Sequence, residues 1–477
     1  MPTGMTRKGT GIYMKYNGNK VEDIQIAYVG GGSRGWAWGL MSDLMTYGDI
    51  SGTVYLYDID MQAAKNNEII GNKFNQAQGA RTTWHYTAVE TLEQALTGAD
   101  FVVLSILPGT FDEMESDVHA PEKYGIYQSV GDTSGPGGIL RAMRTIPMYE
   151  VIAEGIKNCC PDAWVINYTN PMTLCVKALY RVFPKIKAFG CCHEVFGTQK
   201  FLAEVVKEEL GIPAVERHEI KVNPVAVNHF TWLTEAKYRD VDLFPVYRAY
   251  CDKHPDGRGG QGPMDNNWMN SSFACDEKVK MDLFRRFGWI AAAGDRHLAE
   301  FCEGKWYLES PERVKEMHFG LTPVSWRKED LVKRLARSAR LVSGEEEVKI
   351  SGTGEEGVNQ IRALLGLTEL VTNVNIPNRG QIPNLPLGAV VETNAVFRAG
   401  SLRPVFAGEI PDSIYPLVAR ICGEQELLSE SIARRDLEGI FQAFANDPLV
   451  TCGLADARKL FEEMCGNTGA YLTMYGR

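Results

Sequence analysis

Cys192 and His229 combine a soft thiolate with an imidazole, and this pair suits Mn, Fe, Co, Ni or Zn. Two protein ligands leave several coordination positions open, as a catalytic metal requires. Each residue also has a simpler role, because a lone cysteine often packs as a small buried hydrophobe and a lone histidine as a satisfied core residue. The two residue types therefore indicate a candidate divalent-metal site, with the structural roles as the alternative.

A glycine-rich turn stands between a predicted strand at 24–29 and a predicted helix at 36–46. Its G-x-G-x-x-G spacing lets the backbone approach a pyrophosphate, and the helix N-terminus supplies free N–H donors. Asp58 ends the next strand, where a carboxylate accepts hydrogen bonds from a ribose 2′-OH and repels a 2′-phosphate, so NAD is predicted rather than NADP. The alternative is that the glycines only make a tight bend. The residues expected to hold NAD are Gly30, Gly32, Ser33, Arg34, Gly35 and Asp58.

Polar residues also end the neighbouring predicted strands. Ser105 and Asn167 each lie at such an end, so both are expected near the nicotinamide side of the cofactor. Asn170 precedes a proline and is able to present its amide to a sugar hydroxyl, although Asn-Pro more often only forms a turn. Asp132 lies in a glycine-rich stretch, where it is either a turn residue or a member of the site.

The elements that must position these residues alternate along the first half of the chain. Short apolar runs predict strands at 53–57, 101–106, 163–167 and 187–190, and helical patterns lie between them at 61–78 and 138–157. Such alternation is typical of α/β proteins and predicts a Rossmann-like, doubly wound parallel sheet. Ligands of this fold bind outside the carboxyl ends of the strands.

The pattern changes near residue 221. Residues 225–238 alternate like an antiparallel or mixed strand, and residues 254–265 form a loop rich in Gly, Pro and Asp. Helical patterns follow at 278–287, 328–342, 354–364 and 427–464. We predict a leader over 1–20, an NAD-binding Rossmann-like domain over 21–220, and a mixed α/β domain over 221–477 that completes the site.

Composition excludes several classes of partner. The 477 residues carry a formal net charge of −10, which argues against binding to nucleic acid. No apolar run reaches the length of about 18 residues that a membrane span needs, and the basic start of the chain has no apolar region of a secretory signal. The 11 cysteines are scattered and odd in number, so we expect no disulfide framework and a cytoplasmic location.

Taken in order, these motifs resemble glycoside hydrolase family 4, the NAD- and divalent-metal-dependent glycosidases. The resemblance runs from the glycine turn to the Asn-Leu-Pro and Val-Val-Glu stretches at 384–386 and 390–392, which is most of the chain. It implies a route outside the two-carboxylate scheme of most glycosidases. NAD⁺ takes a hydride from C3 of the sugar, a base removes the C2 proton, the glycosidic oxygen leaves by elimination, water adds, and NADH returns the hydride.

The resemblance also implies roles for individual residues. Mn²⁺ or another divalent metal on Cys192 and His229 would hold O2 and O3 of the sugar and polarise the C3 carbonyl. His193 matches an acid or leaving-group residue, and Asp132 would tune the base. Asp282 matches the position of the base, a tyrosine in some members, although it is equally a solvated charge on an amphipathic helix.

The Cys-His-Glu-Val tetrapeptide at 192–195 resembles the α-galacturonidase and α-glucuronidase branch of the family. Phospho-disaccharide members carry an arginine near the position of Met114, and this chain has none there. We therefore predict hydrolysis of an α-linked uronic acid, α-galacturonide before α-glucuronide. The substrate would contact Asn170, and the residues that could hold its carboxylate are Arg296, His297 and His193.

Three other functions remain open. An α-galactosidase of the same family would share every motif. An NAD-dependent hydroxy-acid dehydrogenase would need no Mn²⁺ and would give net NADH, and a non-catalytic NAD-binding protein would have no use for Cys192 and His229. In each case the partners expected are small molecules, without nucleic acid or membrane, and a homodimer or homotetramer is expected.

Overall fold

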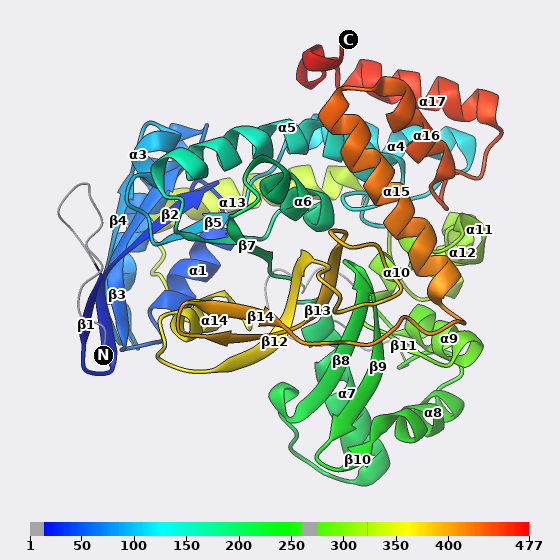
Figure 1. Ribbon diagram of the computed structural model, residues 1–477, viewed down its shortest axis with the longest axis horizontal. Helices are drawn as coiled ribbons and strands as arrows, with labels where there is room; N and C mark the ends of the chain where they lie inside the picture. Colours follow the sequence, from blue (N-terminus) through cyan, green and yellow to red (C-terminus); the bar gives the residue numbers. More distant parts are fainter. Residues whose placement is uncertain (1–13, 260–274, 322, 477) are drawn as a thin grey trace.

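Six parallel strands form the centre of the larger sheet in the computed structural model, which describes residues 14–259, 275–321 and 323–476 (Figure 1). Their order across the sheet is β4 (Trp84–Ala88), β3 (Ile50–Tyr57), β2 (Lys20–Val29), β5 (Phe101–Leu104), β6 (Trp164–Asn167) and β7 (Lys187–Gly190). Numbered along the chain, this is the order 3-2-1-4-5-6 of dinucleotide-binding sheets. The predicted Rossmann-like fold is confirmed.

Side chains of these strands pack alternately into two hydrophobic cores, one on each face of the sheet. In β5, Val102 packs into the core that contains α5 (Gly135–Cys159), whereas Val103 packs into the core that contains α1 (Trp36–Leu44). A strand covered on both faces needs an unbroken apolar sequence, because successive side chains point in opposite directions. This is why the short apolar runs of the sequence fold as central strands.

The described structure begins inside the predicted leader. A short strand, β1 (Lys15–Asn17), pairs antiparallel with the start of β2. Residues 1–13 of the leader lie outside the described residues, as do residues 260–265 of the predicted glycine-rich loop.

Three antiparallel strands from the second half of the chain extend the same sheet beyond β7. They are β12 (Leu370–Pro377), β13 (Val390–Arg398) and β14 (Ser401–Pro404). Asn375 of β12 pairs with Gly190 of β7. The sequence analysis did not anticipate that residues after 221 would contribute to the Rossmann sheet. The extension brings β13 close to the residues that follow β7.

A smaller antiparallel sheet forms the second lobe, at the bottom of Figure 1. Within it, Val227 pairs with Phe230, so the intervening Asn228 and His229 form the turn of a hairpin. The alternation seen at 225–238 in the sequence belongs to this hairpin. The strands of the second lobe are β8 (Ile220–Val227), β9 (Phe230–Tyr238), β10 (Val241–Asp242) and β11 (Ile290–Ala291).

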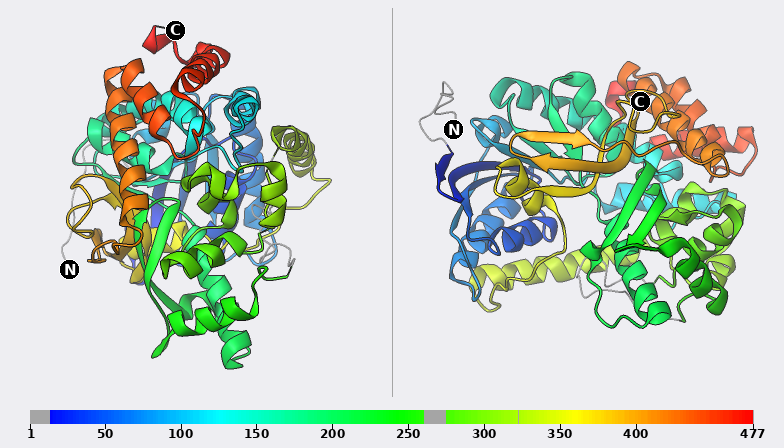
Figure 2. Two further views of the ribbon diagram at one scale, coloured as in Figure 1. Left: turned by 90° about the vertical axis from the view of Figure 1, so that its right-hand side faces the viewer. Right: turned by 60° about the horizontal axis from the view of Figure 1, so that its bottom comes forward.

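Helices cover both sheets, and the last three lie together beside α5 (Figures 1 and 2). These three are α15 (Tyr415–Arg434), α16 (Leu437–Asn446) and α17 (Leu454–Asn467). The others are α2 (Met61–Lys73), α3 (Leu92–Leu96), α4 (Phe111–His119), α6 (Met172–Val182), α7 (Glu194–Leu210), α8 (Leu243–Lys253), α9 (Lys278–Phe287), α10 (Asp295–Phe301), α11 (Gly304–Tyr307), α12 (Pro311–Glu316), α13 (Val324–Ser343) and α14 (Gly357–Leu364). Within the described ranges, none of the helices is both long and apolar enough to cross a membrane.

Candidate active site

The glycine turn brings the ends of β2 and β5 into contact. Gly30 has a φ of +93°, and a Cβ atom on it would lie 1.9 Å from the carbonyl oxygen of Ser105. No L side chain fits there, so this position requires glycine. The N–H of Ser105 donates to the carbonyl of Val29 at 3.0 Å. Ser105 therefore lies directly against the turn.

The turn leads into α1, whose first N–H groups have no side-chain cap. Gly35 is the N-cap residue, so these donors remain available for an anion. Asp58 lies beside them, because its Oδ2 accepts the N–H of Gly32 at 2.8 Å, and burial raises its pKa. The structure thus brings together all the residues predicted for the phosphate and ribose, namely Gly30, Gly32, Ser33, Arg34, Gly35 and Asp58.

Asn167 does not reach the open site as expected. Its side chain is 0 % exposed and is bonded internally, with Oδ1 accepting from the hydroxyl of Tyr149 at 2.5 Å and Nδ2 donating to the carbonyl of Thr169 at 3.0 Å. A side chain engaged in this way fixes the loop after β6. These contacts favour a positioning role for Asn167, and its place near the nicotinamide stays a prediction.

Cys192 and His229 approach one region from two different elements. Cys192 follows β7, His229 lies in the β8–β9 turn, and both are buried. Asn228, directly before His229, interacts with the Cys192 thiol, whose pKa is raised well above its usual range by burial and by the charges of Glu392 and Glu194. The predicted metal ligands are thus neighbours across the two sheets.

Glu392 of β13 holds this region in place. Its Oε2 accepts from the hydroxyl of Thr231 at 2.5 Å, and its Oε1 accepts from the amide of Asn373 at 2.8 Å. The same amide donates to the backbone carbonyl of Cys192 at 3.1 Å. Partners of this kind orient the residues that bind a metal. The sequence analysis had marked Glu392 only as part of a family motif.

The ring of His229 lies between a hydroxyl and a second imidazole. Its Nδ1 is 3.3 Å from Oγ1 of Thr133, and its centroid is 4.2 Å from that of His297. Burial and the charge of His297 lower the pKa of His229 to about 3, so the ring is neutral at pH 7. A neutral imidazole is the form that binds metals. His297, predicted to face the substrate, is therefore placed beside the candidate metal ligand.

Glu194 is a member of this cluster that the sequence analysis did not select. Its Oε2 accepts the N–H of Gly294 at 2.7 Å, and its Oε1 lies 3.6 Å from His193 and 3.8 Å from His297. Burial opposes ionisation, but the charges of these two histidines and of His229 outweigh it and lower the pKa of Glu194 to about 2. Its position two residues after Cys192 was the signal that could have found it.

The charge of Arg141 acts on the carboxylate of Asp132, which also interacts with His229. Burial disfavours the ionised form of Asp132, but Arg141, His297 and His229 outweigh it and lower its pKa to about 2. Thr133 adds a hydrogen bond of 2.7 Å from its Oγ1 to the carboxylate. Asp132 is thus an ionised member of the cluster. Arg141 was not selected from the sequence, where it looks like an ordinary residue of a helix.

His193 is held by a carboxylate from a distant part of the chain. Its Nδ1 is 3.0 Å from Oε1 of Glu355. Burial alone would lower the pKa of His193, but Glu355 and Glu194 outweigh burial and raise it to about 9. The imidazole is therefore protonated at pH 7. No sequence motif linked Glu355 to His193, because Glu355 lies in the loop that precedes α14, far along the chain, and only the fold brings it to His193.

Two predicted substrate residues differ in their environment. Arg296 points into the protein, since its guanidinium donates to the backbone carbonyl of Gly320 at 3.1 Å and to that of Ser129. Asn170 instead has a buried Oδ1 with no hydrogen-bond partner in the described part of the chain, and its backbone carbonyl accepts from Nε of Arg141 at 3.1 Å. The structure thus favours Asn170, and not Arg296, as a direct substrate contact.

Asp282 lies apart from the cluster. Its Oδ2 accepts from Nε of Arg286 at 2.8 Å and from the hydroxyl of Tyr307 at 2.7 Å. The first contact is an ion pair across one turn of α9, and the second joins α9 to α11. These contacts favour a role for Asp282 in joining two helices, and the role of base stays a prediction.

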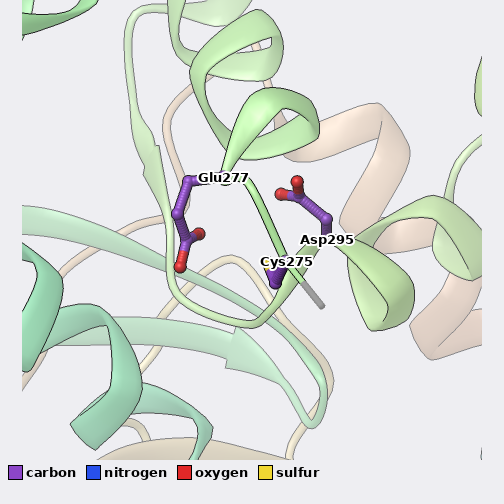
Figure 3. Close-up of side chains that lie close together, drawn as sticks. All are labelled: Cys275, Glu277 and Asp295. Atoms are coloured by element: carbon purple, nitrogen blue, oxygen red, sulfur yellow. The ribbon is translucent and has the colours of Figure 1, made fainter. Parts of the chain in front are cut away.

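A second group of potential metal ligands lies beneath α9 and α10. Figure 3 shows Cys275, Glu277 and Asp295, whose ligand atoms lie within 4.8 Å of one another. The ammonium of Lys280, 2.5 Å from Glu277, already supplies a positive charge, and the backbone N–H of Lys280 donates to Asp295 at 3.0 Å. A buried lysine that pairs with these acids explains the group as a structural ion cluster.

Two family models match the chain. Residues 25–208 match the model described as family 4 glycosyl hydrolase, and residues 225–450 match its C-terminal domain. Together they span the glycine turn, both candidate metal ligands and all three strands that extend the large sheet.

Individual proteins give the same result. An α-galacturonidase from Thermoanaerobacterium saccharolyticum is 61% identical over 96% of this chain and 98% of its own length. A crystal structure of a Bacillus subtilis protein assigned as a glucosidase covers 93% of this chain and 100% of its own, with 50% identity and a TM-score of 0.87. A 6-phospho-α-glucosidase from gut microorganisms, solved with NAD and Mn²⁺, shares the fold with a TM-score of 0.77 at 17% identity, over 93% of this chain and 98% of its own.

Proposed function

Because the chain belongs to family 4 of the glycosyl hydrolases, we propose that it hydrolyses the α-glycosidic bond of a uronic acid, with α-galacturonides as its substrates. The observation that carries this proposal is the 61% identity to an α-galacturonidase over 96% of the chain. Cys192, His193, Glu194 and His297 form one cluster, which supports it. α-Glucuronides and α-galactosides are the alternative substrates.

The glycine turn fits a dinucleotide. A Cβ atom would fill the space at Gly30, and the first turn of α1 has no side-chain cap, so the backbone offers the cradle and donors that a pyrophosphate needs. Asp58 fits the ribose of NAD. When bound, NAD supplies the transfer of a hydride from C3 of the sugar and its later return.

Cys192 and His229 fit a divalent metal such as Mn²⁺. They offer a soft sulfur and a neutral imidazole, and Oδ1 of Asn228 and Nδ1 of His297 are buried beside them without a hydrogen-bond partner among the described residues. When bound, the metal supplies polarisation of the oxygen at C3. Glu392 and Asn373 hold the backbone and turn that carry these two ligands.

Three side chains of the cluster are suited to move protons. Glu194 and Asp132 are carboxylates whose charges act on His229, and we assign the removal of the C2 proton to this pair in place of Asp282. Oε1 of Glu194 faces two imidazoles, whereas its Oε2 is fixed by a backbone N–H. His193, held by Glu355, is placed to give a proton to the leaving oxygen.

The experiment that tests the function uses a panel of p-nitrophenyl α-glycosides with NAD⁺, Mn²⁺ and a reductant. Release of p-nitrophenol from the α-galacturonide, without accumulation of NADH, is expected. The reductant keeps the thiolate of Cys192 reduced. Stoichiometric NADH without release of p-nitrophenol would instead identify a dehydrogenase, and faster release from the α-glucuronide or the α-galactoside would change the sugar.

Location and assembly are part of the proposal. None of the 11 cysteines, which all lie in the described residues, forms a disulfide, and this supports the cytoplasm, where thiols stay reduced. Leu387 and Phe406 are 76% and 69% exposed, and apolar surface of this kind supports a homodimer or homotetramer. Light scattering during gel filtration measures the mass and decides the number of subunits.

A further inference from the structure

Arg141 on α5 is a buried arginine with unused donors. It is 7% exposed, and the only hydrogen bond that its guanidinium makes to the described residues runs from Nε to the carbonyl of Asn170 at 3.1 Å. Neither terminal nitrogen is among the enclosed atoms that lack a partner. Both nitrogens therefore face open space beside Asn170, which was predicted to contact the substrate.

The free donors of Arg141 call for an anionic partner. A buried charge is costly unless it is paired, and guanidinium groups bind carboxylates through two parallel hydrogen bonds. Asp132 feels the charge of Arg141, but within the described chain the two form no direct ion pair. The partner that satisfies the fork of Arg141 therefore lies outside the described residues, and a bound anionic substrate is the candidate that we develop.

Two further arginines make the surroundings positive. Arg296, fixed by backbone carbonyls, and Arg327 of α13 both act on the charge of Asp132, as Arg141 does. The charges of three guanidinium groups thus act on one aspartate. This local excess of positive charge favours a substrate that carries an acid group, in a protein whose overall charge is −10.

Asn170 supplies the neighbouring contact. Its Oδ1 is a buried acceptor with no partner among the described residues, and its backbone carbonyl is the atom that fixes Arg141. A sugar acid offers what this pair lacks, namely two carboxylate oxygens next to a hydroxyl donor. Neutral sugars offer only hydroxyl groups.

We propose that Arg141 is the residue that selects uronic acids, by binding the C6 carboxylate through its two terminal nitrogens while Asn170 accepts a hydrogen bond from a neighbouring sugar hydroxyl. This inference rests on the proposed function, and it assigns the carboxylate to Arg141 rather than to Arg296, His297 or His193. A phosphate on C6 is the rival anion with the same charge recognition.

The test compares Arg141→Gln and Arg141→Lys with the wild type on p-nitrophenyl α-galacturonide and α-galactoside. Loss of a charge-assisted pair predicts a KM for the galacturonide that is about 30-fold higher or more in Arg141→Gln, with a change of about threefold or less for the galactoside. Arg141→Lys keeps the charge but not the fork, so an intermediate KM is expected. Arg458→Gln, far along the chain on α17, is the matched control with unchanged selectivity.

The ratio of the KM for the α-galacturonide to the KM for the α-galactoside separates recognition of the carboxylate from other effects of the substitution. Arg141 also stabilises the charge of Asp132, and that effect must change kcat for both substrates alike. Equal losses on both substrates, or an unchanged ratio, would overturn the inference. A preference for the α-galactoside 6-phosphate that disappears in Arg141→Gln would assign the site to phosphate and overturn it as well.

Binding of free D-galacturonate, measured by calorimetry, keeps the test independent of catalysis. We expect D-galacturonate to bind the wild type and to bind Arg141→Lys with a higher Kd. The Kd for Arg141→Gln should be higher than that of the wild type by about 30-fold or more. If the wild type cleaves no galacturonide but binds D-galacturonate through Arg141, only the proposed function fails. If it cleaves galacturonide and all variants bind D-galacturonate equally, only this inference fails. If Arg141→Gln does not fold, Arg141→Lys decides the test alone. An equal Kd for D-galacturonate in Arg141→Lys and the wild type would contradict recognition through the two terminal nitrogens of Arg141.

Discussion

Buried carboxylates of this protein have opposite pKa shifts, according to the charges that face them. Asp132 and Glu194 are ionised because arginine and histidine charges outweigh their burial. Glu300 accepts the N–H groups of Val130 and Gly131 at 2.7 and 2.9 Å, yet burial dominates and raises its pKa to about 8. Neighbouring acids thus hold different protonation states at pH 7, which is how one site can supply groups of different kinds.

Glu300 makes the stability of the protein depend on pH. Its pKa rises from 4.5 to about 8 on folding, so the native state binds the proton more tightly and the stabilisation is lost as the pH rises through about 8. We expect Glu300→Gln to narrow the difference in Tm between pH 5.5 and pH 8.5. Glu309→Gln, at an exposed position, is the control. An equally wide difference in Glu300→Gln would contradict the shift.

Glu194 and Asp282 are distinguished by their contacts. Glu194→Gln removes a carboxylate from the cluster, and we expect kcat to fall about 100-fold or more, as for loss of a general acid or base. Asp282→Asn disturbs only the contacts with Arg286 and Tyr307, so kcat should change by about threefold or less, with a lower Tm. The reverse order of the two effects would restore Asp282 as the base.

At the scale of elements, several functional groups of the candidate site lie in the loop or turn that directly follows a strand. The β2 turn exposes backbone donors, the residues after β7 present Cys192, and the β8–β9 turn presents His229. Where the turn after β2 meets the end of β5, the main chain itself sets the distance between the two segments. At Gly30 this geometry leaves no room for a side chain.

Gly30→Ala tests the close approach of β2 and β5. The new Cβ would lie 1.9 Å from a carbonyl oxygen, so the turn must open, and we expect a Kd for NAD at least about tenfold higher and a clear fall in Tm. Gly79→Ala is a matched control, because Gly79 has the same φ of +93° with no atom within 4 Å of its Cβ position. Equal effects of the two substitutions on the Kd would show that strain, and not the contact with Ser105, matters at Gly30.

At the scale of the whole molecule, one buried arginine makes an ion pair within the first half of the chain and a hydrogen bond to its last part. Arg144 of α5 binds Asp117 of α4 through both terminal nitrogens, at 2.5 and 3.1 Å, and donates to Thr468 after α17 at 3.1 Å. The pair is almost wholly buried. The ion pair joins α4 to α5, and the hydrogen bond to Thr468 connects this pair to the end of α17.

Arg144→Met leaves Asp117 buried without a partner, and we expect a loss of about 3–5 kcal/mol in the free energy of unfolding. The double variant Arg144→Met with Asp117→Leu removes both charges and should recover most of this loss. Urea unfolding followed by fluorescence measures all three proteins. A double variant no more stable than the single one would show that packing, and not charge, holds the helices.

The fold of the first half and a set of candidate site residues could be predicted from the sequence, because glycine turns, strand ends and metal-binding side chains leave local patterns. Asp58 and Cys192 could be placed in this way. Glu355 and Arg141 could not, since their importance comes from contacts between elements distant in the chain. The contacts of Asp282 with Arg286 and Tyr307 could not be predicted either, because a charge on an amphipathic helix looks the same whether it faces a substrate or another helix.

The strands β12 to β14 make completion of the site a late event in synthesis. Until residues 370–404 leave the ribosome, the edge of β7 has no partner from β12, and the backbone at Cys192 lacks the contacts of Asn373 and Glu392. An unpaired edge of this kind favours association with other chains. A nascent or truncated chain that ends before β12 would therefore be prone to aggregate, and a chaperone that shields this edge would protect the enzyme during its biogenesis.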